Sequence, residues 1–181
     1  MPTQAELFAS VFVLAQHLAH LGDAELAGIG LTTKQWLLLA VLHRGFPDRD
    51  PTLSEAATLY GSSRQNVKAI ASKLVDLGYL NLIEDPSDRR AVRLRVTAKT
   101  AVFDSAEWMT RERAFFARVF GGLDTEALPG ILELVTRWIA ALSPAAREAL
   151  GRNADLHRAP DAGGSRRGAP THPRGTSRSN G

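Results

Sequence analysis

The chain has no cysteine among its 181 residues. This absence excludes disulfide bonds, thiolate metal sites and a thiol-based redox switch. Long apolar runs are lacking as well, because the longest, residues 36–42, falls well short of the roughly 18 residues that a membrane-spanning helix needs. The first ten residues contain no lysine or arginine and no cleavage pattern, which argues against a secretory signal. We therefore expect a cytoplasmic protein without membrane contact.

The short motifs of common enzyme classes are also missing. The sequence has no Gly-x-Ser-x-Gly elbow, no glycine-rich phosphate loop and no His-Glu-x-x-His metal pair. His43, Asp48 and Asp50 could be taken for a metal cluster, but they fall in a connection with proline and glycine, where a polar loop is the simpler interpretation. We therefore expect no catalytic activity, no bound metal and no cofactor.

The formal net charge of +3 is spread unevenly. Six arginines and only two aspartates follow position 150, so residues 1–150 are close to neutral. Beyond Leu156 there is no large apolar side chain, and glycine, proline, serine, threonine and arginine dominate. Such a composition cannot bury enough apolar surface to offset the entropy of ordering. We expect one folded domain over residues 1–150 and a disordered basic tail over residues 151–181.

Three helix-start signals crowd into the first half of the chain. Thr32 with Gln35, Thr52 with Glu55 and Ser62 with Gln65 each fit the Ser/Thr-x-x-Glu/Gln capping box. They predict three short helices over residues 33–44, 53–60 and 63–77, with breaks at glycines 61 and 78. Three closely spaced helices with a tight turn between the last two form a helix-turn-helix.

Apolar residues at helical spacing flank this unit on both sides. They predict one helix over residues 5–21 and a long one over residues 98–120, with Thr97 as its N-cap. A last helix, reaching Leu142, either begins at Pro129 or is kinked there. None of these helices is needed to complete the central unit. We expect a second copy of the chain to bury their apolar faces.

The third short helix, residues 63–77, divides into two faces. On a helical wheel its apolar residues face the core, and a polar set faces outward. Glutamine and asparagine can pair with adenine, arginine with guanine, and serine or lysine with phosphate. An ordinary solvated helix face explains the same pattern equally well. The outward and flanking residues that could reach DNA are Arg64, Gln65, Asn66, Lys68 and Ser72.

Residues 80–96 read as a β-hairpin. Apolar and polar residues alternate on either side of an Asp-Pro-Ser-Asp turn, which is the period of paired strands. The apolar face should pack on the helices, and the exposed face and tip should carry Arg89, Arg90, Arg93 and Arg95. Residues 61–97 hold seven Lys/Arg against four Asp/Glu, so this surface should attract anions. An arginine at the tip suits a narrow minor groove. Pairing of these arginines with Asp85 and Asp88 is a further reading, and we expect Asp88 to support the tip while Arg90 points outward.

At this point the sequence resembles the MarR (multiple-antibiotic-resistance regulator) family. The likeness runs from LTTKQWLLLAVL through TLSEAATLYGSSRQNVKAIASKLVDLGYL to DPSDRRAVRLRVT. Its most specific part is the wing, where Asp88 and Arg90 match the family's Asp-x-Arg ahead of Thr97. One departure is Thr100, where the family commonly has glycine.

This resemblance implies an α+β, mostly α fold. The fold is a winged helix-turn-helix with a two-stranded β-wing and additional N- and C-terminal dimerisation helices, and its DNA-binding lobe spans about residues 31–97. The resemblance implies a homodimer that binds a pseudo-palindromic double-stranded operator, usually as a repressor. It also implies relief by a small aromatic or anionic ligand. Residues 63–66 and Lys68 correspond to the DNA-reading start of the recognition helix, and Arg90 to the minor-groove residue of the wing.

An effector of this family would bind between the lobe and the dimerisation helices. That region would include His17, His20, Trp36 and Trp108, with Arg111 and Arg113 as partners for an anion. Each has a simpler explanation that we favour: Trp36 lies among leucines and reads as core, and a histidine on an amphipathic helix is usually surface.

One functional alternative remains from another class of protein. A winged helix can bind proteins instead of DNA, and a basic wing could dock on an acidic partner. Arginines gathered at a tip, beside glutamine and asparagine able to read bases, favour DNA.

Overall fold

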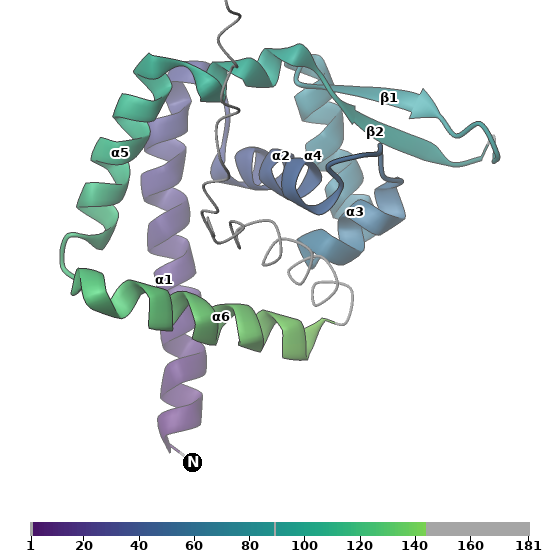
Figure 1. The fold of residues 1–181 in the computed structure, drawn as a ribbon. Coiled ribbons are helices and arrows are strands. Elements are labelled where there is room, and N and C mark those ends of the chain that lie inside the picture. Colours follow the sequence, from purple (N-terminus) through teal and green to yellow (C-terminus); the bar gives the residue numbers. More distant parts are fainter. Residues whose placement is uncertain (1, 89, 144–181) are drawn as a thin grey trace, which may run out of the picture.

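The computed structural model describes residues 2–88 and 90–143 as a mostly helical chain with one β-hairpin, which confirms the predicted fold class (Figure 1). The α-helices are α1 (Pro2–Leu26), α2 (Thr33–Gly45), α3 (Leu53–Tyr60), α4 (Arg64–Asp76), α5 (Ala106–Phe120) and α6 (Leu128–Leu142). The strands are β1 (Leu80–Glu84) and β2 (Val92–Val96), and short 3-10 segments lie at η1 (Ala27–Ile29), η2 (Ala98–Asp104) and η3 (Thr125–Ala127).

Two of the three predicted capping boxes form. The Thr32 hydroxyl accepts from the amide of Gln35, and the Gln35 side chain accepts from the Thr32 amide. Thr52 and Glu55 do the same at the start of α3. These reciprocal bonds satisfy amides that have no partner inside the helix, which explains why the helices begin where they do.

The third predicted box is wrong by one residue. Ser63, not Ser62, caps α4, because its hydroxyl accepts from the Asn66 amide. Ser62 instead accepts a hydrogen bond from the side chain of Asn66. Two adjacent serines offer the same cap chemistry, and the local backbone decides between them: Gly61 takes a left-handed φ of 73° and ends α3.

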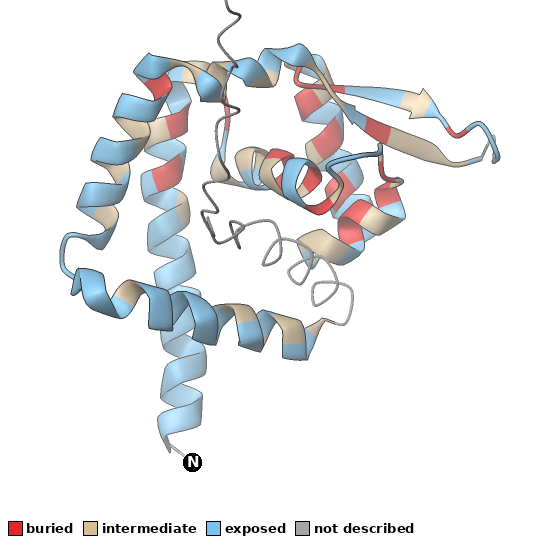
Figure 2. Cartoon of the chain, in the orientation of Figure 1, coloured by how far each residue is buried: buried red, intermediate tan, exposed pale blue. Residues whose placement is uncertain are grey.

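The core lies where α2, α3, α4 and the base of the hairpin meet (Figure 2). The inward face predicted for α4 is correct, since Val67, Ala71 and Leu74 are buried and Ile70 and Leu77 are partly buried. The other fully buried large side chains are Leu38, Tyr79, Leu80 and Leu94. This shared core holds α4 and the hairpin in a fixed relation, so that their outer surfaces form one face.

The hairpin pairs in antiparallel register, with Leu80 opposite Val96 and Leu82 opposite Leu94. Leu80 and Leu94 are buried as expected, but Leu82 is 43% exposed. The prediction of a wholly packed apolar face is therefore wrong at Leu82. The wing projects away from the helices beyond its base (Figure 1), so alternation alone overstates how far the core extends.

The single helix predicted over residues 98–120 is wrong in its first part. Residues 98–104 form η2, and α5 begins afresh at Ala106. Thr97 does cap η2, but Ser105 is in extended conformation and caps α5 through the Trp108 amide. This second cap interrupts the helix and places Trp108 in the core. The last helix starts at Leu128 and has Pro129 in its first turn, which agrees with the first of the two alternatives for this proline.

The terminal helices expose much apolar surface (Figure 2). Helix α1 is longer than the predicted residues 5–21, and residues 3–29 include a stretch long and apolar enough, by length and composition, to cross a membrane. The core helix of a soluble protein and a signal sequence pass the same test, so length and composition alone do not assign this helix to a membrane. Exposed large apolar residues on α1 and α6 include Leu7, Phe8, Val11, Phe12, Leu14, Ile131, Leu132, Leu134, Val135, Ile139 and Leu142.

Helix α1 joins the lobe through a tight contact with the start of α2. The Asp23 carboxylate accepts from the Thr33 amide at 2.6 Å, and the Thr33 hydroxyl donates to the Ala19 carbonyl at 2.9 Å. Gly22 faces this threonine so closely that a Cβ atom would overlap the Thr33 hydroxyl. These bonds fix α2 directly against α1. The predicted tail, residues 151–181, and the end of the predicted domain lie outside the described residues.

Candidate nucleic-acid interface

The outward face of α4 is open to solvent along its first three turns. Arg64, Gln65, Lys68 and Ser72 are all exposed, with the small Ala69 between them. Neither Arg64 nor Lys68 makes an ion pair or side-chain hydrogen bond within the described residues. Their charges and the Gln65 amide are therefore available to an external ligand. The first turn of a helix also presents free backbone amides, which add to its attraction for anions.

The two remaining residues predicted at this end of α4 are partly engaged. Ser63 uses its hydroxyl to accept from the Asn66 amide at 3.2 Å. The Asn66 side-chain nitrogen donates to the Ser62 hydroxyl at 2.8 Å. Both residues are exposed. Asn66 therefore keeps its amide oxygen for a partner, while Ser63 mainly sets where the helix starts.

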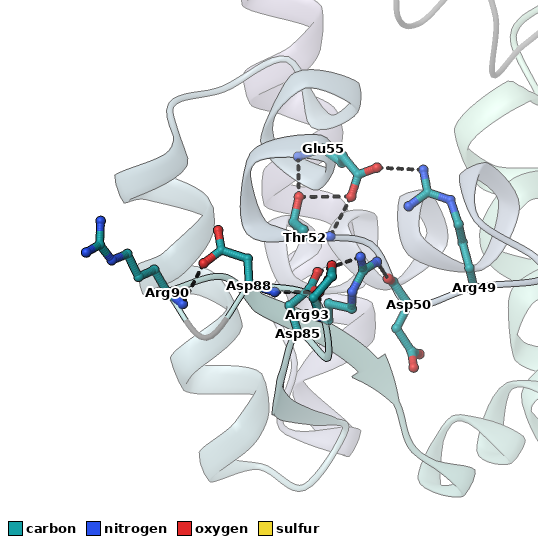
Figure 3. A network of polar contacts seen from close by, with 9 residues as sticks. Arg49, Asp50, Thr52, Glu55, Asp85, Asp88, Arg90 and Arg93 are labelled. Atoms are coloured by element: carbon teal, nitrogen blue, oxygen red, sulfur yellow. Dashed lines mark hydrogen bonds and ion pairs between the residues drawn. The ribbon is translucent and has the colours of Figure 1, made fainter.

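The turn of the wing begins with a buried carboxylate, directly after β1. Asp85 is 4% exposed and accepts from the Ser87 amide at 2.8 Å and the Ser87 hydroxyl at 2.6 Å (Figure 3). Its other oxygen pairs with the guanidinium of Arg93. The hydrogen bonds from Ser87, followed by the pairing with Arg93, lower the pKa of Asp85 from 3.8 to about 2. Asp85 thus stays charged and holds the turn closed.

Arg93 is the clearest departure from the predicted set of exposed wing arginines. Its side chain is only 27% exposed, and besides Asp85 it donates to the Asp50 carbonyl at 2.8 Å. The neighbouring Arg95 is exposed but pairs with the Asp50 carboxylate at 2.9 Å. Both arginines therefore tie the wing to the α2–α3 connection. The alternation of apolar and polar residues predicted an exposed Arg93, because a sequence pattern carries no information about the α2–α3 connection that crosses the hairpin.

The tip of the wing is arranged differently. The Asp88 carboxylate accepts from the Arg90 amide at 2.9 Å, and the Asp88 carbonyl accepts from the Ala91 amide at 2.8 Å. These bonds close the turn, a geometry consistent with the supporting role predicted for Asp88. The Arg90 side chain extends away from the network (Figure 3) and is exposed. Arg89 lies outside the described residues.

Sequence reasoning missed one further ion pair beside the wing. The Arg49 guanidinium contacts the Glu55 carboxylate at 2.7 Å. This contact and the bonds from Thr52 lower the pKa of Glu55 from 4.5 to about 2. Only the charge alternation Asp48-Arg49-Asp50 hinted at a structured connection.

The basic residues on this face therefore fall into two groups. Arg49, Arg93 and Arg95 are neutralised by acidic partners, whereas Arg64, Lys68 and Arg90 have no acidic partner among the described residues. The unpaired cations lie at the start of α4 and at the tip of the wing. Paired groups position the surface and unpaired groups give it its charge.

The residues predicted to bind an effector are only partly brought together. Trp36 and Trp108 line a cavity of about 220 Å³ between α1, α2 and α5, and both also line a neighbouring cavity of about 180 Å³. Trp108 is buried in the core and Trp36 is half-buried, in line with the core interpretation. His17 and His20 are exposed and line neither cavity.

The two arginines expected to hold an anion are used elsewhere. Arg111 donates to the Glu25 carboxylate at 3.2 Å and to its carbonyl at 2.8 Å, and Arg118 joins the same carboxylate at 2.9 Å. Arg113 bonds within its own helix, to the Met109 carbonyl. None of the three lines either cavity. In this arrangement neither Arg111 nor Arg113 is placed to hold an anion in these two cavities.

Comparison with known proteins places this geometry in a family. A family model described as MarR family matches residues 29–91. The uncharacterized protein Rv2011c of Mycobacterium tuberculosis is 33% identical over 140 residues, which cover 76% of this chain and 93% of that protein. The transcriptional activatory protein BadR of Rhodopseudomonas palustris is 25% identical over 115 residues, 64% of this chain and 66% of that protein.

Solved structures show the same fold. A MarR transcriptional regulator from Methanosarcina mazei Go1 aligns with a TM-score of 0.64 at 17% identity, over 76% of this chain and 99% of the other. BpsR of Bordetella bronchiseptica, whose DNA binding is regulated by 6-hydroxynicotinic acid, aligns with a TM-score of 0.61 at 18% identity, over 74% and 98%. With its winged helix, its unpaired basic surface and these relatives, the chain belongs to the MarR family of DNA-binding transcriptional regulators and is not an enzyme.

Proposed function

We propose that the protein is a homodimeric regulator that binds a pseudo-palindromic site in double-stranded DNA. Helix α4 enters the major groove, where Arg64, Gln65 and Asn66 meet base edges and Lys68 meets phosphate. Arg90 at the wing tip enters the adjacent minor groove. The observation that carries this proposal is the separation of paired from unpaired cations, which leaves positive charge where a duplex would lie.

The exposed apolar side chains of the terminal helices support the dimer. Phe8 and Phe12 on α1 are 62% and 58% exposed, and Leu132 on α6 is 67% exposed. A stable monomer rarely leaves this much apolar surface in water. A second copy covering the same helices would bury it and would set two α4 helices on one side of the dimer.

The test is a footprint on the region upstream of the protein's own gene. Two α4 helices related by a two-fold axis should protect two half-sites whose centres lie about 10 bp apart, one helical turn. Arg64→Ala should remove the protection. A footprint without two-fold symmetry would contradict the dimeric mode. If the protein bound no duplex at all at low ionic strength, the alternative of a wing that docks on an acidic protein would be favoured.

Repression is the output that we propose. A dimer bound across two successive grooves blocks polymerase wherever its site overlaps a promoter. BadR, a relative, is described as a transcriptional activatory protein, so activation is the outcome that the experiment has to distinguish from repression. A reporter under the upstream region should rise in a strain that carries Arg64→Ala, whereas activation would make it fall. Because the target is chromosomal, we infer that the protein works in the cytoplasm.

Relief by a small aromatic ligand completes the proposal. The cavity lined by Trp36 and Trp108 lies between α1, α5 and α2, where a bound molecule would touch both the dimerisation helices and the lobe. BpsR, whose DNA binding responds to 6-hydroxynicotinic acid, is a structural neighbour with such a response. A ligand that binds better to a conformation unable to span both half-sites would release DNA. Operator titrations with and without the ligand measure this.

A further inference from the structure

The cavity between α1, α2 and α5 has an unusual charge for an effector site. Trp108, Glu112, Phe115, Phe116 and Val119 lie on one face of α5, since they recur at steps of three and four residues. Helix α5 runs beside the C-terminal part of α1 (Figure 1), to which Arg111 and Arg118 bind it. The opposite wall comes from α1 and α2, including Leu18, Leu26 and Trp36.

Acidic groups are the only charged side chains among the described residues that line this cavity. They are Glu25 and Glu112. Glu25 is neutralised from outside by Arg111 and Arg118. Glu112 is half-buried and has no hydrogen bond or ion pair within the described part of the chain. It lines both cavities, and the smaller one is also lined by His43, Arg44 and Asp104.

Aromatic rings surround this carboxylate. Trp36 and Trp108 line the same two cavities, and three phenylalanines line the larger one. The face of an indole ring attracts cations, and aromatic side chains with a nearby carboxylate are the usual receptor for quaternary ammonium groups. Trp108 already has a cation close to its ring, since the Arg111 guanidinium carbon lies 5.7 Å from the ring centre.

We propose that this cavity binds a small apolar cation, an aromatic molecule that carries a quaternary ammonium or protonated amine group. The ring occupies the apolar wall formed by α1 and α5, and the positive group sits against Glu112 between the two indoles. Anionic aromatics are disfavoured in the larger cavity, because a carboxylate in a partly water-excluded site repels them and no cation lines that cavity, whereas Arg44 lines only the smaller one. Binding of this cation to the cavity does not depend on the proposed function. An effect of the cation on DNA binding rests on the proposed function.

The test compares three benzene derivatives of similar size on the full-length protein. Benzyltrimethylammonium carries the positive charge, benzyl alcohol is neutral and salicylate is negative. Calorimetry should give the tightest binding for the cation, and the indole N–H signals of Trp36 and Trp108 should shift in NMR spectra while that of Trp138, which lines neither cavity, stays in place.

Glu112→Gln is the decisive variant, because it keeps the shape of the side chain and removes the charge. It should weaken binding of the cation about tenfold, the effect of losing one partly desolvated ion pair, and leave benzyl alcohol unchanged. Glu107→Gln, an exposed glutamate in the first turn of the same helix, is the matched control and should change nothing. Thermal unfolding of both variants checks that they fold.

Two outcomes overturn the inference: salicylate binding more tightly than the cation, or equal cation binding by the wild type and Glu112→Gln. Because these titrations contain no DNA, their result is separate from that of the footprint. A protein that prefers the cation but ignores duplex DNA would contradict the proposed regulatory function and leave the cavity assignment intact. The reverse result would remove only the cavity assignment.

Discussion

Arg93 donates both to the buried carboxylate of Asp85 and to the backbone carbonyl of Asp50, and thereby joins the wing to the α2–α3 connection. Arg90, only three residues earlier, has a side chain that extends from the wing tip into solvent. Two arginines on one hairpin therefore have opposite roles. One shapes the wing and the other is offered to a ligand.

This difference predicts that alanine substitutions at the two positions separate stability from DNA binding. Arg90→Ala should leave Tm unchanged and weaken operator binding about tenfold. It should also flatten the dependence of log affinity on log salt by about one unit for each subunit, because a contact with the phosphate-rich groove is lost. Fluorescence anisotropy at several salt concentrations measures both quantities.

Arg93→Ala should instead lower Tm by several degrees, because it leaves the buried Asp85 without its cationic partner. Any loss of DNA affinity should come only indirectly, from disorder of the wing. The slope of log affinity against log salt should therefore change little. Differential scanning calorimetry beside the same anisotropy series tests this. A variant with normal Tm and a flattened salt slope would return Arg93 to the DNA-contacting group.

The lowered pKa of Asp85 predicts a loss of stability in acid. The folded protein holds this group at a pKa of about 2, below its ordinary 3.8, so the charged form stabilises the fold. That contribution is complete above pH 3.8 and disappears as the pH falls toward 2. Asp85→Asn should be less stable than the wild type at pH 7 and should lose less stability between pH 4 and pH 2.

Urea unfolding midpoints at constant ionic strength measure this dependence. Glu55, whose pKa is also lowered to about 2, contributes in an overlapping range, so some acid sensitivity should remain in Asp85→Asn. Asp76→Asn serves as the control, because Asp76 is exposed and lies 3.9 Å from its nearest cation, Lys73. An acid profile of Asp85→Asn identical to that of the wild type would contradict the assignment.

The start of α4 supplies a prediction that distinguishes two neighbouring serines. Ser63→Ala removes the hydroxyl that caps the helix and should cost about 1 kcal/mol of unfolding free energy. Ser62→Ala removes only a partner of the Asn66 side chain and should cost less. Urea titrations rank the two. A larger loss of stability for Ser62→Ala than for Ser63→Ala would identify Ser62 as the N-cap, as the sequence pattern predicted.

The exposed apolar face of α1 predicts that charge there prevents dimerisation. Phe12→Glu should convert the protein to a monomer in sedimentation equilibrium and abolish protection of paired half-sites. Leu37→Glu is the control, since Leu37 is 42% exposed but lies on α2. A Phe12→Glu protein that remains a dimer would place the interface on other helices.

The sequence predicted what depends on neighbouring residues. The caps at Thr32 and Thr52, the two faces of α4 and the limits of α3 all follow from spacings of three or four residues. The tip of the wing was also predictable, because an aspartate two residues before Arg90 can bond to its backbone amide.

What the sequence did not reveal depends on contacts between distant segments. The pairing of Arg93 with Asp50 joins residues 43 positions apart, and that of Arg111 with Glu25 joins residues 86 positions apart. Periodicity says which side of a strand or helix a residue occupies but not what lies opposite. The break before α5 was missed for another reason: Ser105 is compatible with a continuous helix as well as with the cap that it forms.

The bonded joint between Thr33 and Asp23, closed by the absence of a side chain at Gly22, has a mechanical consequence. Because α2 is fixed to α1, any change of tilt between the two α1 helices of a dimer moves each helix-turn-helix unit as a rigid body. The distance between the two α4 helices along DNA is then set by the tilt of the α1 helices at the dimer axis.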